Sequence, residues 1–257
     1  MPKEAGNTVM RIILSPAKKM NVDTDKLEYK GLPVFIKQTE LILDWLRKQS
    51  YADLQKLWGC NEKIAEQNYK RIEEMDLHNR LTPAILSYEG IAFQYMAPAV
   101  FGDSSFDYVQ EHLRILSGFY GVLKPMDGVT PYRLEMQAKA GIDGSKDLYD
   151  LWSFRLYDEV RDETGIIINL ASKEYSKCIE KYLKPNDTYI TVNFCEKSGD
   201  KLVTKGTYAK MARGEMVRFM AENMIEDPAD IKKFNRLGYV YRDDLSNDAE
   251  IVFERQK

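Results

Sequence analysis

The chain has few of the residues that build disulfide or metal frameworks. Its 257 residues include three cysteines and two histidines: Cys60, Cys178, Cys195, His78 and His112. The cysteines are odd in number and widely spaced, so we expect no disulfide framework and no CxxC pair, which favours a reducing cytoplasm. The histidines lie in unrelated segments, so no catalytic triad and no HExxH zinc site is expected. We therefore expect neither a metal nor a cofactor.

The sequence also lacks long apolar runs and a strong net charge. No run is long enough to span a membrane, and we expect no signal peptide and no membrane partner. A net charge of -3 and a pI of about 5.7 exclude a uniformly basic nucleic-acid coat, so any polyanion site must be a local patch. A Walker-type phosphate loop and the glycine fingerprint of dinucleotide-binding folds are absent too.

The hydrophobic content of 44% is enough for a sizeable core. Apolar runs predict buried strands, and apolar positions at helical spacing predict helices. The main strands are expected at 10–15, 113–117 and 165–172, and the main helices at 33–48, 51–58, 61–75, 147–163 and 208–224. This alternation predicts a mixed α/β (α+β) fold, with a mixed sheet and helical insertions in a single domain over 10–257. Residues 1–9 are expected to be a loose preface.

Polar side chains follow the predicted strands at the points where the strands end. Because the carboxyl ends of parallel strands meet at one edge of a sheet and helix N-termini there attract anions, these side chains are candidates for a ligand site. The simpler alternatives are that the serine at 172 caps a helix and that the lysine pair is only solvated. The candidates are Ser15, Lys18, Lys19, Asn169, Ser172 and Glu174.

The predicted helix at 208–224 supplies further cations. Lys210 and Arg213 lie beside its apolar stripe, since positions three and four apart are neighbours on a helix. Gly214 inside the helix costs about 1 kcal/mol relative to alanine, which indicates a close approach. Either another element packs there, or a ligand or the loop at 131–136 comes close beside the two cations.

The two short helices at 51–58 and 61–75 are similar to a helix-hairpin-helix. In that motif, the backbone N–H groups of the turn hold a DNA phosphate whatever the base sequence. Gly59 and Lys63 would supply the turn and the charge, while Asn61 stands where a second glycine is usual. Two packed helices without a ligand are the alternative, and Glu62 and Glu66 add charge of the wrong sign.

The stretch 118–136 contains three glycines and two prolines, and we expect it to form an irregular loop. We expect it to hold Tyr132, Arg133 and Glu135 rigidly over the strand ends, since pre-organisation lowers the ordering cost of binding. Arg133 would bind an anion, and Glu135 would orient Arg133, Lys18 or Lys210. The alternative is an internal ion pair that only braces the loop.

Five segments carry a resemblance to a known family: "ILSPAKKM", "SYEGIAFQYMAP", "LRILSGFYGVLKPMDGVTPYRLEM", "INLASKEYSK" and "YAKMARGEMVRFM". In this order they resemble the peroxide stress protein YaaA family. The resemblance implies a cytoplasmic bacterial protein of the hydrogen peroxide response that limits free iron, with a mixed α/β fold of few relatives. It also implies DNA binding, through a hairpin at 57–65 and a cleft with Lys18, Lys19, Arg133, Lys210 and Arg213.

Two functions follow from these patterns. We favour a non-enzymatic stress protein that binds double-stranded DNA non-specifically, which the hairpin supports. The alternative is an enzyme that acts on an anionic, nucleotide-like small molecule in the same cleft, which the polar residues at the strand ends support. A small deep pocket would favour the enzyme, and a broad open groove would favour DNA.

Overall fold

The computed structural model describes residues 10–25, 27–199 and 201–256. The expected preface at 1–9 and the last residue of the expected domain therefore lie outside the described residues. The main sheet has the order β11-β12-β9-β8-β1-β5-β6, with β10 paired to β9. Its parallel strands are β1 (Arg11–Leu14), β5 (Leu113–Ser117), β8 (Ile166–Asn169), β9 (Thr188–Ser198) and β12 (Glu250–Arg255). The antiparallel ones are β6 (Gly121–Leu123), β10 (Lys201–Val203) and β11 (Tyr239–Tyr241). The predicted mixed α/β fold with a mixed sheet is confirmed.

The central strands form the core of the molecule. Ile12, Ile13, Ile115 and Ile168 are completely buried, because helices cover a parallel sheet on both faces. This double burial is why the strands read as continuous apolar runs in the sequence. Two small antiparallel pairs lie outside the main sheet: β2 (Lys19–Met20) with β4 (Tyr88–Glu89), and β3 (Thr82–Pro83) with β7 (Gly128–Val129).

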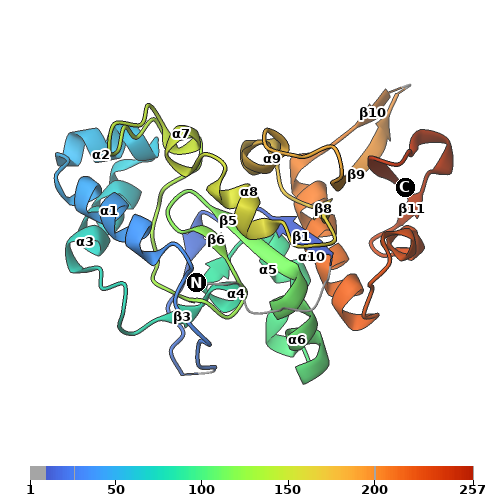
Figure 1. The fold of residues 1–257 in the computed structure, drawn as a ribbon, viewed down its shortest axis with the longest axis horizontal. Helices are drawn as coiled ribbons and strands as arrows, with labels where there is room; N and C mark the ends of the chain where they lie inside the picture. Colours follow the sequence, from blue (N-terminus) through green and yellow to red (C-terminus); the bar gives the residue numbers. More distant parts are fainter. Residues whose placement is uncertain (1–9, 26, 200, 257) are drawn as a thin grey trace.

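The helices lie around the central strands of the sheet (Figure 1). Figure 1 shows α1 (Ile36–Arg47), α2 (Tyr51–Trp58) and α3 (Glu62–Glu74) gathered at one end, with β9 to β12 at the other. The remaining helices are α4 (Ala84–Ser87), α5 (Ile91–Met96), α6 (Asp103–His112), α7 (Leu148–Trp152), α8 (Arg155–Val160), α9 (Lys173–Glu180) and α10 (Gly206–Glu222), with the 3-10 helices η1 (Pro98–Val100), η2 (Pro228–Lys233) and η3 (Asp243–Leu245). Within the described part of the chain, no helix is both long and apolar enough to cross a membrane.

One helix prediction is wrong. The pattern over 147–163 predicts a single helix, but the structure divides it into α7 and α8. Ser153 ends α7 with a φ of 48°, in a region that non-glycine residues rarely adopt. The indole Nε1 of Trp152, just before this break, donates to the carbonyl oxygen of Gly118 at 3.0 Å. Tertiary packing therefore overrides helical periodicity here.

Helices α5 and α10 pack in direct backbone contact. A Cβ on Gly214 of α10 would lie 2.7 Å from the carbonyl carbon of Ala92 in α5, which is closer than Cβ atoms come in proteins. The packing explanation for this glycine is therefore the correct one, and the neighbour is α5 instead of the loop at 131–136. The contact fixes the position of α10 relative to α5.

The loop after β5 folds back over the end of its own strand. The buried Tyr132 hydroxyl lies 2.6 Å from Ser117 Oγ and 2.8 Å from the Tyr88 hydroxyl. A Cβ on Gly118 would lie 2.6 Å from the carbonyl oxygen of Leu134, so the returning chain is pressed against this turn. The residues that follow Tyr132 are thereby placed over the carboxyl ends of the parallel strands.

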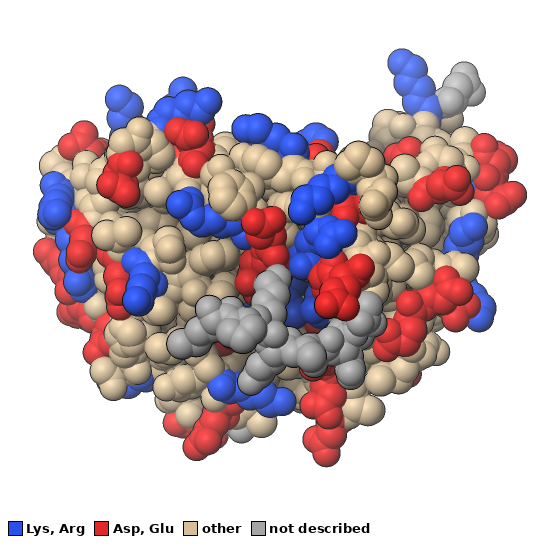
Figure 2. Space-filling view, in the orientation of Figure 1, with Lys and Arg blue, Asp and Glu red and all other residues tan. Residues whose placement is uncertain are grey.

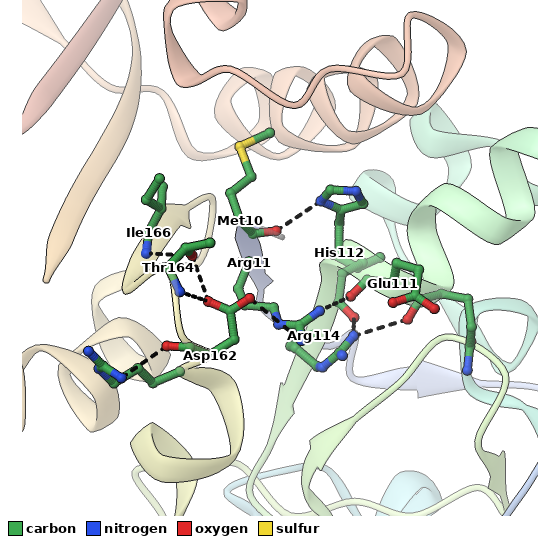
Figure 3. A network of polar contacts seen from close by, with 11 residues as sticks. Met10, Arg11, Glu111, His112, Arg114, Asp162, Thr164 and Ile166 are labelled. Atoms are coloured by element: carbon green, nitrogen blue, oxygen red, sulfur yellow. Dashed lines mark hydrogen bonds and ion pairs between the residues drawn. The ribbon is translucent and has the colours of Figure 1, made fainter. Parts of the chain in front are cut away.

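A polar network occupies the opposite, amino-terminal ends of the strands (Figure 3). His112 Nδ1 lies 2.9 Å from the carbonyl oxygen of Met10, and the Arg11 guanidinium lies 3.9 Å from the Asp162 carboxylate. The Thr164 hydroxyl donates to that carboxylate at 2.6 Å. The end of α6 and the segment between α8 and β8 are thus tied to the start of β1.

Candidate functional site

A cavity of about 390 Å³ opens at the carboxyl ends of β1 and β8. We call it the strand-end pocket. It is formed by the turn after β1, the start of α5, the loop after Tyr132, the start of α9 and one side of α10. The structure brings most of the predicted site residues together there: Ser15, Lys18, Lys19, Tyr132, Arg133, Glu135, Ser172, Glu174, Lys210 and Arg213.

Three predicted residues are not among those that line the pocket. Asn169 is buried beside it, where its Oδ1 accepts from the Ala171 amide at 2.9 Å and its Nδ2 contacts Thr191. It braces the end of β8 instead of facing a ligand. Gly59 and Lys63 are exposed on the α2–α3 hairpin, at the α1 end of the molecule (Figure 1).

Ser172 occupies the N-cap position of α9, but its side chain makes no capping hydrogen bond. Instead, its amide donates to Ser15 Oγ at 2.8 Å, and the two hydroxyl oxygens lie 3.1 Å apart. The expectation that Ser172 lies at the helix N-cap is confirmed, whereas the capping hydrogen bond of its side chain is absent. Ser15, the residue after β1, accepts from the Ser172 amide and so ties the end of β1 to the start of α9 inside the pocket.

Ion pairs compensate part of the charge in the pocket. Glu135 Oε1 lies 2.9 Å from Lys18 Nζ and 3.5 Å from an Arg133 guanidinium nitrogen. Lys19 Nζ lies 2.5 Å from Glu89. Glu135 thus contacts both Lys18 and Arg133, an arrangement that suits the orienting role expected of it as well as a simple brace.

The cations of α10 differ from those of the turn after β1. Neither Lys210 nor Arg213 has a carboxylate partner among the described residues, and the buried Nε of Arg213 makes no hydrogen bond there. Burial lowers the pKa of Arg213. A guanidinium that is partly withdrawn from water without a counter-ion is a ready partner for an anion.

Glu174 brings a carboxyl group to the same pocket. Burial raises the pKa of this group, and the nearby Glu135 carboxylate acts in the same direction. The Gln137 amide donates to Glu174 Oε1 at 3.3 Å, which opposes the rise. The described residues contain no group of three or more His, Cys, Asp or Glu side chains placed to hold a metal ion.

Sequence reasoning missed one wall of the pocket. Glu89, Ile91, Ala92 and Phe93 line it from β4 and α5, and Tyr175 lines it from α9. A two-residue strand and a six-residue helix are too short to give a periodic signal. One indication of this wall was present in the segment "SYEGIAFQYMAP", which carries the family resemblance. It contains no lysine or arginine, and so no candidate anion-binding residue.

The outer surface bears charges of both signs. On the face shown in Figure 2, the described Lys and Arg side chains are interspersed with Asp and Glu. This mixture agrees with the net charge of -3. Among the described residues, the candidate site for anion binding is therefore the strand-end pocket.

The fold and the site define a mixed α/β protein with a polar, cation-bearing pocket at the ends of its parallel strands. Residues 10–245 match the family model described as peroxide stress protein YaaA. A UPF0246 protein of Agathobacter rectalis is 69% identical over 247 residues, covering 96% of this chain and 99% of that protein. UPF0246 proteins of Lachnoclostridium phytofermentans and Limosilactobacillus reuteri are 54% and 50% identical, covering 95% and 96% of this chain and 96% and 100% of theirs. The chain belongs to the peroxide stress protein YaaA family.

Proposed function

We propose that this peroxide stress protein acts by holding an anionic small molecule in the strand-end pocket, and thereby limits oxidative damage linked to free iron. Arg213 carries the proposal, because its guanidinium lines the pocket without a carboxylate partner in the described chain. The cavity of about 390 Å³ falls in the range of about 300–1,000 Å³ that small-molecule sites occupy. A protein–DNA interface instead covers a far broader surface, about 1,000–2,500 Å².

A cytoplasmic location belongs to the same proposal. Cys60, Cys178 and Cys195 are free thiols in the structure, and unpaired cysteines are typical of reducing compartments. Burial raises the pKa of Cys178 to about 12 and also raises that of Cys195. These two thiols are therefore poor nucleophiles, and we assign them no part in the peroxide response.

Peroxide survival of a cell that lacks its own copy of the protein tests this function. We expect Arg213→Met and Arg133→Ala each to reduce survival to the level of cells without the protein, because each removes a cation of the pocket. Arg218→Met is the matched control, since Arg218 lies on the same helix, pairs with Glu222 at 2.7 Å and does not line the pocket. Purified variants must unfold as the wild type does, and folded variants that protect fully would refute the proposal.

The α2–α3 hairpin supports DNA binding as a second candidate function. Gly59 ends α2 in the left-handed conformation with a φ of 54°, and Asn61 caps α3 by accepting from the Ile64 amide at 3.0 Å. The Asn61 cap occupies the Ile64 amide, but the exposed Lys63 adds positive charge at this helix N-terminus, where anions are favoured. Glu62 and Glu66 lie in the same stretch and weaken this attraction.

Duplex affinity at low and at physiological salt tests the hairpin. We expect weak binding that falls steeply with salt, because it would depend on phosphate contacts alone. The double substitution Gly59→Pro with Lys63→Glu should abolish the binding at low salt. Equal affinities of both proteins at both salt concentrations would exclude the hairpin as a DNA site.

A further inference from the structure

The pocket has an excess of two positive charges. Three of the lining cations, Lys18, Lys19 and Arg133, are matched in number by three lining carboxylates, Glu89, Glu135 and Glu174. Glu89 lies 2.5 Å from Lys19, and Glu135 lies 2.9 Å from Lys18 and 3.5 Å from Arg133. Lys210 and Arg213 then remain, and the described residues provide no carboxylate contact for either. Because both cations lie on one side of α10, they favour a ligand group with two negative charges over a carboxylate with one.

Beside these cations the pocket wall is apolar. Ile91, Ala92 and Phe93 of α5 line it, and the contact between Gly214 and Ala92 holds this wall against the helix that carries Arg213. A ligand with its anionic group at Arg213 therefore has its body beside apolar side chains. Such a pocket suits a molecule with a charged head and an apolar body.

Other residues that line the pocket are polar. Ser15, Ser172 and Glu174 line it with two hydroxyl groups and a carboxyl group that form hydrogen bonds. Tightly bound small molecules are commonly fixed by a few such groups within an apolar pocket. A body with apolar faces and a polar edge, as a nucleobase has, would satisfy both kinds of wall.

We propose that the strand-end pocket binds a phosphate monoester of nucleoside size, with its phosphate at Lys210 and Arg213 and its base against α5. A phosphate monoester carries a charge of about -1.5 to -2 at neutral pH, which matches the two uncompensated cations. Arginine binds phosphate oxygens in a bidentate manner, as it does carboxylates, so the choice of a phosphate rests on the pair of cations at Lys210 and Arg213. This assignment rests on the proposed function, because it names the ligand class of the same pocket.

Calorimetric titration of the full chain tests the assignment, with 5′-AMP and 5′-UMP as probes. We expect at least one of them to bind at one site per chain. Adenosine or uridine, which lack the phosphate, and inorganic phosphate, which lacks the body, should each bind at least about tenfold more weakly.

Substitutions in the pocket make the test specific. Arg213→Met and Lys210→Met should each weaken nucleotide binding by about tenfold or more, and Arg218→Met should change it by less than about twofold. Lys210 is exposed, so its variant stays folded even if the Arg213 variant does not. Affinity unchanged by Lys210→Met, or no binding of either nucleotide, would overturn the assignment. If neither nucleotide binds but Arg213→Met still abolishes peroxide protection, the ligand class is wrong and the anion-binding function stands.

Discussion

Two carboxyl groups among the described residues have a pKa that is raised by burial. In the strand-end pocket it raises the pKa of Glu174, so this group retains a proton at a higher pH than an exposed glutamate does. Under the loop at 124–128 it raises the pKa of Asp127 to about 7, although the Lys124 amide and the Arg114 guanidinium act in the opposite direction. Each group therefore binds its proton more tightly in the folded chain than in the unfolded chain, and this links its ionisation to folding.

Asp127→Asn tests that linkage. Because the folded-state pKa of Asp127 lies above its unfolded value of about 3.9, its contribution to stability is present at low pH and is lost as pH rises to about 7. The asparagine variant should therefore lose less free energy of unfolding between pH 5 and pH 8 than the wild type, by on the order of 2 kcal/mol. Urea unfolding at both pH values measures this. Asp248→Asn, at an exposed position, is the control, and a pH profile identical to that of the wild type in Asp127→Asn would contradict the linkage.

At the scale of elements, the sequence predicts what local patterns encode. The strands β1, β5 and β8 are continuous apolar runs, and α2 and α3 have clear apolar spacing with a glycine turn between them, so all five are found where they were predicted. The break between α7 and α8 was not predictable, because it depends on Ser153 adopting a positive φ of 48° in its tertiary setting. The cations of the pocket were predictable, because they follow strand ends or lie on a helix face. The apolar wall of the pocket was not, because it arises from packing between α5 and α10, which are far apart in the sequence.

The contact between α5 and α10 predicts the effect of Gly214→Ala. Alanine is the better helix former by about 1 kcal/mol, yet its Cβ would lie 2.7 Å from the carbonyl carbon of Ala92. Because the neighbour is backbone and cannot turn away, we expect a net loss of about 1–3 kcal/mol in the free energy of unfolding. Denaturant unfolding measures it. In the control Gly206→Ala, on the same helix, the added Cβ has no neighbour within 4 Å, so stability should not fall. A Gly214→Ala protein as stable as the wild type would show that the two helices separate easily.

At the scale of the whole molecule, the two candidate activities are physically separate. The strand-end pocket lies between α5, α9 and α10, whereas Gly59 and Lys63 lie on the hairpin at the α1 end. The net charge of -3 gives the chain no general attraction for polyanions, so each activity depends on its own few cations. Variants of one site should therefore leave the other intact, and peroxide survival can assign protection to one of them.

The proposed link to free iron raises the question of whether the protein binds iron itself. Among the described residues, no group of three or more His, Cys, Asp or Glu side chains is placed to hold a metal. Glu89, Glu135 and Glu174 all line the pocket, but they do not come together as such a group, and any two of them are fewer than the donors that iron usually takes from a protein. We therefore expect protein purified under anaerobic, chelator-free conditions to carry no stoichiometric iron, and its effect on iron to be indirect. Elemental analysis decides this. One iron per chain in the wild type, lost in Glu135→Ala or Glu174→Ala but retained in an exposed control such as Glu62→Ala, would make these carboxylates iron ligands.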